Sequence, residues 1–306
     1  LMERPIPLYV GSGSPLSNVG TLTNQGIELE VGYKLSVDKV NLSFLANASY
    51  VKNEIKNLGN QTGYIDKESL PTLGTVSRNQ NGYPIGYFFG YKAIGVFQTQ
   101  EEIDNYISPA TGKPIQPNAV PGDTKFEDLN GDGVISDDNE DRTMIGKPNP
   151  DWMVGLTVAA DWNGFDLSAF FQGSFGADVF DALRRYELAA VNYTSDALER
   201  WTGPGTSNSM PRIVLGDTPK NFRPSTLLVH DASFLRLRNL QVGYTLPAQL
   251  TRKAYIQRLR FYASFDNLLT ITGYKGMDPE IGSTMGIDKG VYPQARVYTF
   301  GLNLTF

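Results

Sequence analysis

Apolar and polar residues alternate with a period of two in seven segments of this chain. The first segment reads IELEVGYKL, in which almost every second side chain is apolar. This period is typical of β-strands that have one apolar and one polar face. The pair Asn163-Gly164 is a strong signal for a two-residue hairpin turn, and Asp38-Lys39 separates two further segments. We therefore predict an all-β antiparallel fold with long strands in residues 27–35, 40–50, 152–162, 165–171, 240–246, 259–265 and 298–306.

The lengths and ends of these strands separate two kinds of β protein. Alternation occurs in soluble sandwiches, whose apolar face covers a core, and in outer-membrane barrels, whose apolar face contacts lipid. The four longest segments reach the ~9–11 residues that a tilted membrane strand needs, and all seven exceed the ~5–6 of a typical soluble strand. Aromatic residues such as Tyr50, Trp152 and Trp162 stand at strand ends, where membrane barrels carry aromatic girdles. The pattern favours a transmembrane barrel.

The connections between the strands are alternately short and long. If the short ones at 38–39, at 163–164 and around Pro247 are periplasmic, the long ones are extracellular loops at about 52–150, 173–232 and 270–293. An apolar stretch at 85–98 would break this order as an eighth spanning strand, so we place it inside the first loop. Bacterial barrels have an even number of strands, and seven cannot close one. The sequence therefore predicts the C-terminal part of a larger barrel.

Composition excludes several functional classes. The chain has 306 residues, no Cys and one His, so a disulfide framework, a thiolate or multi-histidine zinc site and a Cys nucleophile are excluded. It carries 27 Lys and Arg against 32 Asp and Glu, a formal net charge of −5, without runs of basic residues. Binding to nucleic acid needs clustered positive charge, so we expect no nucleic-acid partner.

Several motifs, in order along the chain, resemble the C-terminal half of SusC/RagA-type TonB-dependent transporters. They include GYPIGYFFGYKAIGVFQTQEEID (82–104), GDTKFEDLNGDGVISDDNEDRTMIGKPNPDW (122–152), FLRLRNLQVGYTLP (234–247) and YPQARVYTFGLNLTF (292–306). The resemblance runs from about residue 18 to the end of the chain. It implies that the whole chain, residues 1–306, is the C-terminal portion of a transmembrane barrel of about 22 strands. The terminal Phe306 fits the aromatic assembly signal of that family.

The resemblance also implies a function. Members of this family import nutrient oligomers, either glycans or peptides, across the bacterial outer membrane. A SusD-like surface lipoprotein closes over the extracellular mouth, and TonB acts through an N-terminal plug and a contacting segment, neither of which is in this chain. The outer-membrane lipid, the lipoprotein, the TonB complex and an oligosaccharide or peptide substrate are thus the expected partners. No feature of the sequence chooses between glycan and peptide, so the substrate-binding residues are unknown.

One motif points to a metal. Residues 128–135, DLNGDGVI, match the first eight positions of an EF-hand-type calcium loop. Side chains of Asp128, Asn130 and Asp132 and the carbonyl of Val134 would bind a structural Ca²⁺. The twelfth position is Asn139 instead of Glu, so the closing carboxylate must come from Asp138, Glu140 or Asp141. Relatives place an acid just before Arg-Thr, which selects Asp141. The alternative is a turn rich in Asp and Asn that binds no metal.

We expect no enzyme activity. Acidic pairs are common on solvated loops, and His230 has no Ser in a nucleophile motif near it. Asp278-Pro279-Glu280 is interpreted as a turn with a structural role. Loop helices are predicted at 178–190, after Thr99, and at 195–201 with Ser195 as N-cap. The aromatic side chains of the loops either stack on ligands or pack within the loops: Tyr83, Tyr87, Tyr91, Tyr186 and Tyr193. The alternative to a transporter is a secreted, calcium-stabilised, β-rich glycan-binding protein.

Overall fold

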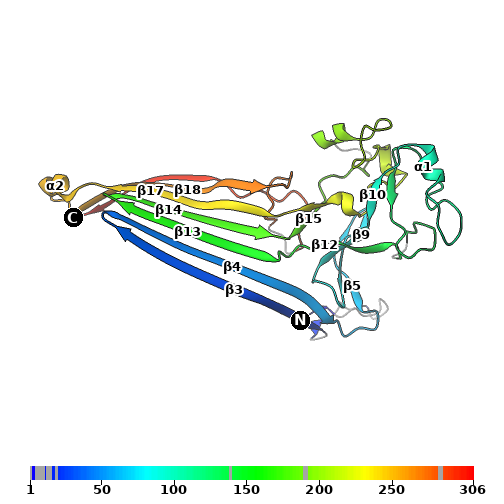
Figure 1. Cartoon of the computed structure of the whole chain (residues 1–306), viewed down its shortest axis with the longest axis horizontal. Coiled ribbons are helices and arrows are strands. Elements are labelled where there is room, and N and C mark those ends of the chain that lie inside the picture. Colours follow the sequence, from blue (N-terminus) through cyan, green and yellow to red (C-terminus); the bar gives the residue numbers. More distant parts are fainter. Residues whose placement is uncertain are drawn as a thin grey trace.

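The computed structural model describes residues 2–3, 11, 16–17, 20–137, 140–188, 192–281 and 285–306. Its main element is one seven-stranded antiparallel sheet in the order β20-β18-β17-β14-β13-β4-β3 (Figure 1). Its strands are Thr21–Val37 (β3), Val40–Asn57 (β4), Trp152–Trp162 (β13), Phe165–Phe175 (β14), Phe234–Thr245 (β17), Arg258–Thr272 (β18) and Val297–Thr305 (β20). All seven predicted strands are confirmed, and so is the all-β antiparallel fold class.

The three short connections lie at one end of the sheet, beside the C-terminus (Figure 1). Between β13 and β14, Asn163 and Gly164 have φ angles of 49° and 89°. Two positive φ angles in succession are what the type I′ hairpin turn requires, and Asn-Gly adopts them with little strain. The connection between β17 and β18 holds a helical turn, Ala248–Thr251 (α2), followed by Arg252–Ala254 (η5).

The register of the sheet gathers the apolar side chains on one face. One row crosses all seven strands as Leu35, Leu42, Ala160, Leu167, Val242, Ala263 and Phe300. The row nearest the turns is rich in aromatic residues: Val37, Val40, Trp162, Phe165, Tyr244, Phe261 and Leu302. Side chains of this face are exposed, reaching 75% at Ile27 and 76% at Phe300. An apolar surface of this extent marks contact with a membrane or with another protein.

The long connections fold together at the opposite end of the sheet (Figure 1). We call residues 58–151, 176–233 and 273–296 the loop domain. Its four-stranded sheet contains Tyr64–Asp66 (β5), Ser77–Gln80 (β8), Tyr87–Tyr91 (β9) and Arg142–Gly146 (β12). A three-stranded sheet contains Asp178–Asp181 (β15), Val229–Asp231 (β16) and Ile287–Asp288 (β19). Two pairs of strands complete the loop domain: Ser69–Leu70 (β6) with Gly74–Thr75 (β7), and Ala93–Val96 (β10) with Thr124–Phe126 (β11). Outside it, Met2–Glu3 (β1) pairs with Leu16–Ser17 (β2).

The apolar stretch 85–98 forms β9 and β10, which belong to the loop domain and not to the seven-stranded sheet. Its placement outside the spanning strands is therefore confirmed. Helix α1, Gln100–Asp104, begins after Thr99, whose side chain accepts a hydrogen bond from the Glu102 N–H as the capping motif predicts. No helix in the described part of the chain is long and apolar enough to cross a membrane.

The prediction of a helix at 178–190 is wrong: residues 178–181 form β15, and the described residues 182–188 form bends and turns without a helix. This strand pairs with β16 and β19, both distant in sequence, and tertiary pairing overrides local helix propensity. Residues 189 and 190 lie outside the described residues. The predicted helix at 195–201 is a short 3₁₀ helix, Ser195–Glu199 (η2), and Thr194 is its N-cap. Two further 3₁₀ turns are Leu215–Asp217 (η3) and Thr226–Leu228 (η4).

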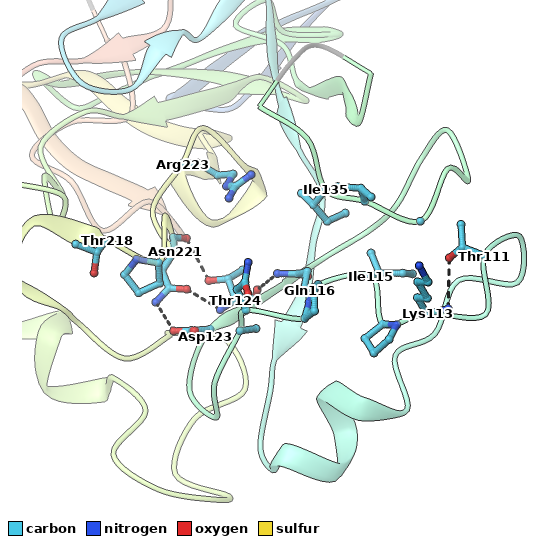
Figure 2. A pocket seen from close by; sticks show the side chains of 17 residues that line it. Thr111, Lys113, Ile115, Gln116, Asp123, Thr124, Ile135, Thr218, Asn221 and Arg223 are labelled. Carbon is cyan, nitrogen blue, oxygen red and sulfur yellow. Dashed lines mark hydrogen bonds between the residues drawn. The ribbon is translucent and has the colours of Figure 1, made fainter.

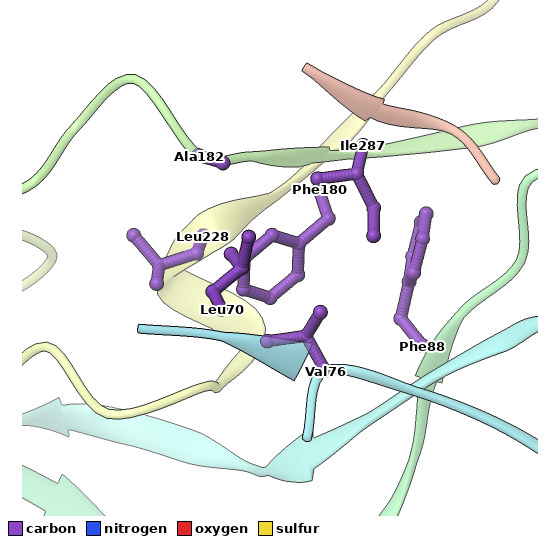
Figure 3. Packing of buried hydrophobic residues seen from close by; sticks show 7 residues of the cluster. All are labelled: Leu70, Val76, Phe88, Phe180, Ala182, Leu228 and Ile287. Atoms are coloured by element: carbon purple, nitrogen blue, oxygen red, sulfur yellow. The ribbon is translucent and has the colours of Figure 1, made fainter. Parts of the chain in front are cut away.

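The buried core lies in the loop domain (Figure 3). One cluster joins all three long connections: Leu70, Val76 and Phe88 from the first, Phe180, Ala182 and Leu228 from the second, and Ile287 from the third. Full burial of one such large side chain stabilises a fold by about 1.5–3 kcal/mol. The three connections are therefore one packed body.

Candidate functional site

The face of the sheet opposite the apolar rows is polar. The row next to the aromatic one reads Ser36, Asn41, Asp161, Asp166, Gly243, Tyr262 and Gly301 across the seven strands. Another reads Lys34, Ser43, Ala159, Ser168, Gln241, Ser264 and Thr299. In a barrel, the polar face lines a wet interior. We call it the inner face.

A cluster of ion pairs ties the third long connection to the inner face. Arg236, which is 1% exposed, donates to the Asp278 carboxylate and, at 3.1 Å, to Glu280 Oε2. Arg238 Nη2 donates to both carboxylate oxygens of Glu280 at 2.6 Å. Asp278 Oδ2 also accepts from the Gln294 N–H at 3.0 Å. Asp278 and Glu280 thus hold a turn as predicted, and they do so through two arginines of β17.

A break in strand register places Arg238 in this cluster. Pairing of β17 with β18 shifts between Leu237 and Asn239, so Arg238 has no single residue opposite it. Its guanidinium bonds to Gln172 Oε1 at 2.6 Å and to Asn267 Oδ1 at 3.2 Å. Asn267 has a φ of 53°, a left-handed conformation that Asn tolerates better than most residues. Sequence reasoning missed both arginines, although the arginines of RLR alternate with leucine inside a strand.

Two cavities open where the inner face meets the loop domain. The larger, of about 960 Å³, is lined by residues 50–54 at the end of β4 nearest the loop domain and by the segments around Tyr83 and Lys147. The smaller, of about 300 Å³, is lined by Gln172, Ser174 and Glu280 among others. They share Asn149, Pro150 and Met153, so they are adjacent. The two cavities therefore form one junction between the inner face and the loop domain.

The aromatic residues of the loop domain mostly pack within it. Tyr87, Tyr91 and Tyr186 are 1%, 4% and 2% exposed, which assigns them to packing. Tyr83 stacks on Tyr87 with ring centroids 4.9 Å apart, and it also lines the larger cavity. Tyr193 is exposed.

Arginines and aromatic rings alternate through the loop domain in one column. Arg78 lies over Tyr64 and Phe89 at 4.1 and 3.6 Å from the ring centroids. Arg142 lies over Phe89 and Tyr91 at 4.4 and 5.7 Å, and Arg223 over Tyr91 and Phe126 at 4.8 and 4.9 Å. Each desolvated cation–π contact contributes up to about 2 kcal/mol. The column joins strands β5, β8, β9, β11 and β12 to the 218–224 turn.

The predicted calcium loop is folded as a series of Asp and Asn turns. Asp128 Oδ1 and Oδ2 each accept at 2.8 Å, from the N–H groups of Gly131 and Gly133. Asn130 Oδ1 accepts from the Asp132 N–H, and Asp132 Oδ1 accepts from the Val134 N–H. The side chains at the first, third and fifth positions therefore converge on one short loop. Val134 is 56% exposed.

The two described candidates for the closing carboxylate point to different places. Asp141 is fully buried, and its oxygens accept from the N–H groups of Leu129 and Ser136 at 3.1 and 3.0 Å. Glu140 Oε2 accepts at 3.0 Å from the Asn130 amide, which also donates to Asp132 Oδ2 at 3.0 Å. Glu140 thus faces the oxygens of the loop, whereas Asp141 closes it from inside. Asp138 and Asn139 lie outside the described residues.

The donor chemistry of this loop fits a hard cation. Carboxylate, amide and carbonyl oxygens are the ligands that Ca²⁺ takes, and one amide N–H₂ group now stands between the carboxylates of Asp132 and Glu140. No group of three or more acidic, Cys or His side chains in the described ranges is already arranged as a metal site. Binding would therefore require the Asn130 amide to turn its oxygen toward the ion.

A cavity of about 700 Å³ adjoins this loop (Figure 2). Its wall includes Gly133, Val134 and Ile135. Two of its polar side chains are already bonded: Gln116 Oε1 accepts from the Phe126 N–H at 2.8 Å, and Asn221 Oδ1 accepts from the Thr124 N–H at 2.8 Å. These groups act as structural braces for the loop domain.

Burial shifts the pKa values of two other side chains, Asp217 and His230. Desolvation raises the pKa of Asp217 to about 6, although the N–H groups of Asn221 and Phe222 both donate to its carboxylate. Burial lowers the pKa of His230, whose Nε2 lies 3.7 Å from Asp181 Oδ2. His230 is part of β16, which agrees with its predicted structural role.

An antiparallel sheet with an exposed apolar face, a polar inner face and all long connections at one end is part of a large transmembrane β-barrel. No protein-family model matches the chain. TonB-dependent receptor P3 of Formosa agariphila is 33% identical to it over 322 residues, which cover 100% of this chain and 31% of that protein. The TonB-dependent receptor SusC of Bacteroides thetaiotaomicron is 30% identical over 295 residues, 94% of this chain and 27% of that protein.

Solved structures give the same result. The RagAB peptide transporter superposes with a TM-score of 0.77 at 27% identity, covering 100% of this chain and 32% of that one. A RagAB peptide importer in a closed state matches with a TM-score of 0.74. Over its whole length, the chain is thus homologous to part of the SusC/RagA-type TonB-dependent receptors, and the resemblance in its motifs is confirmed. It spans about a third of the length of these relatives. They are receptors and transporters, which agrees with the expectation that the chain is not an enzyme.

Proposed function

We propose that the chain is the C-terminal barrel wall and outer loop domain of a transporter that imports nutrient oligomers, glycans or peptides, across the bacterial outer membrane. The observation that carries this proposal is the pair of faces on one seven-stranded sheet. The apolar rows suit contact with lipid, and the polar rows suit a wet interior. The match of the whole chain to about a third of TonB-dependent receptors and of a peptide transporter supports the same function.

The partners follow from this proposal. A SusD-like lipoprotein covers the loop domain from outside, and TonB pulls on a plug that belongs to a part of the transporter beyond this chain. Substrate passes from the loop domain to the inner face through the junction lined by Asn149, Pro150 and Met153. The ion pairs of Arg236 and Arg238 keep the third long connection against the wall of this passage.

Fractionation of cells that make the protein tests the proposal. We expect the protein in the outer membrane, released by detergent but neither by aqueous buffer nor by a calcium chelator. An apolar face that contacts lipid cannot be transferred to water without a large cost. Release by buffer or chelator alone would contradict the transporter and support the secreted, calcium-stabilised glycan-binding protein.

We further propose that the 128–141 loop binds a structural Ca²⁺ through Asp128, Asn130, Asp132 and the carbonyl of Val134. Either Glu140 or Asp141 supplies the last carboxylate ligand. Glu140 is a candidate because the Asn130 amide donates to it and to Asp132. Bound calcium would brace the wall of the 700 Å³ cavity, since Val134 belongs to both.

Titration of the purified protein with Ca²⁺ checks this second proposal. We expect Asp132→Asn to weaken binding by at least about tenfold, because affinity follows the number of charged ligands. Glu140→Gln should do the same if Glu140 closes the loop, and Asp104→Asn, on α1, serves as the control. Unchanged calcium affinity in both loop variants would contradict this proposal and favour a turn that binds no metal.

A further inference from the structure

A cavity of about 310 Å³ lies within the loop domain, and it shares Arg223 with the 700 Å³ cavity. None of its lining residues belongs to the seven-stranded sheet or to the two cavities at the inner face of that sheet. Its volume is at the lower end of those that small-molecule sites occupy. Charged side chains of both signs line it: Asp137, Glu187, Asp217, Arg142, Lys220 and Arg223.

Glu187 presents an unsatisfied acceptor in this cavity. Its side chain is only 9% exposed. Oε1 accepts from Thr72 Oγ1 at 3.1 Å and from the Arg185 guanidinium, whereas Oε2 has no hydrogen-bond partner. A buried carboxylate oxygen without a donor is costly, so a ligand that brings a donor to it gains affinity.

Arg223 presents the complementary donor. Its Nε donates to the Lys220 carbonyl at 3.1 Å, but Nη1 has no hydrogen-bond partner and lies 3.9 Å from Asp137 Oδ1. Lys220, which is half-exposed, is paired with the same Asp137. Two residues in the lining of one cavity therefore carry a buried acceptor and a buried donor without a hydrogen-bond partner. A ligand that satisfies both carries a cationic donor and an anionic acceptor.

Other ligand classes fit less well. A divalent cation would be repelled by three cationic side chains in the lining. A sugar ring usually needs an aromatic face to stack on, and Tyr91, the aromatic residue in this lining, is 4% exposed with two guanidinium groups over its ring. A zwitterion matches the charges of the site without leaving either unsatisfied atom unpaired.

We propose that this cavity binds the head group of an α-amino acid, with its ammonium on Glu187 and its carboxylate on Arg223. The source is either a free amino acid or the end of a peptide. The site lies in the loop domain and does not depend on the import function proposed above.

Calorimetry on the detergent-purified protein tests the proposal with four probes. L-alanine is expected to bind saturably, and N-acetyl-L-alanine and L-alaninamide, each lacking one charge, at least about tenfold more weakly. L-alanyl-L-alanine distinguishes the sources: weaker binding than L-alanine indicates a free amino acid, and equal or tighter binding indicates a peptide end. Because no step requires transport, failure of import leaves this result unaffected.

Variants of the lining complete the test. Glu187→Gln keeps the shape of the side chain and should weaken the binding of L-alanine at least about tenfold. The control Glu101→Gln, at an exposed position, should leave the affinity for L-alanine unchanged. Leu73→Trp, which fills the cavity, should abolish binding in a protein that still resists proteolysis. The proposal is overturned if L-alanine does not bind saturably, if the three single-residue probes bind equally well, or if Glu187→Gln leaves the affinity for L-alanine unchanged.

Discussion

Replacing Leu156 with arginine is expected to weaken barrel assembly by about 2–4 kcal/mol, the cost of a positive charge on the lipid face near the bilayer midplane. Leu156 lies in the middle of β13, opposite Ala46 on one side and Phe171 on the other, within the apolar rows. Its side chain is 38% exposed on the apolar face, so an arginine at this position would place its charge in lipid. The arginine side chain would have to extend toward the membrane surface to reach water, or the barrel would fail to fold.

The next residue provides a matched control. Thr157 lies on the same strand at the same depth, but its side chain is on the inner face, because successive side chains of a strand alternate between faces. Thr157→Arg should assemble nearly as well as the unmodified protein. Assembly is measured as the heat-resistant fraction in outer membranes on gel electrophoresis. Equal loss in both variants, or in neither, would show that the apolar rows do not face lipid.

Replacing Arg236 with alanine is expected to release the third long connection from the inner face. Arg236 is 1% exposed and its guanidinium contacts the carboxylates of Asp278 and Glu280. Removing one partner of a buried ion pair costs about 3–5 kcal/mol, because the remaining charge stays desolvated and unpaired. Asp278 is itself only 7% exposed, so most of this cost falls on it.

Hydrogen exchange measures the release. The backbone N–H groups of Glu280 and Gln294, which both donate to Asp278, should exchange faster in Arg236→Ala. The control is Arg236→Met with Asp278→Asn, which removes both charges and should recover most of the protection, since Glu280 keeps Arg238. Unchanged exchange in Arg236→Ala would mean that packing alone holds the connection, through Ile287 and Tyr274.

The strands were predictable because their signal is local and repeated. Alternation over ten or so residues fixes which side chains share a face, and Asn163-Gly164 fixes one turn. A one-residue slip would turn every apolar side chain to the inner face, so the pattern also restricts the register. The calcium motif was visible for the same reason, since its candidate ligands lie within a few residues of one another.

Features that join distant segments were not predictable. Residues 178–181 read as a helix start, but they form a strand because their partners lie about 50 and 100 residues further along the chain. The sequence places Glu140 and Asp141 side by side, and only the fold turns one to the loop oxygens and the other to buried N–H groups. Arg236 and its two carboxylates are more than 40 residues apart.

By itself, the sequence determined a sheet of seven antiparallel strands with an apolar and a polar face, because periodicity is written in neighbouring residues. The tertiary structure decided where charges meet: the ion pairs at the inner face, the column of arginines and rings, and the cavity with Glu187 and Arg223. Those contacts depend on how three long connections pack into one body, and no local pattern carries that information.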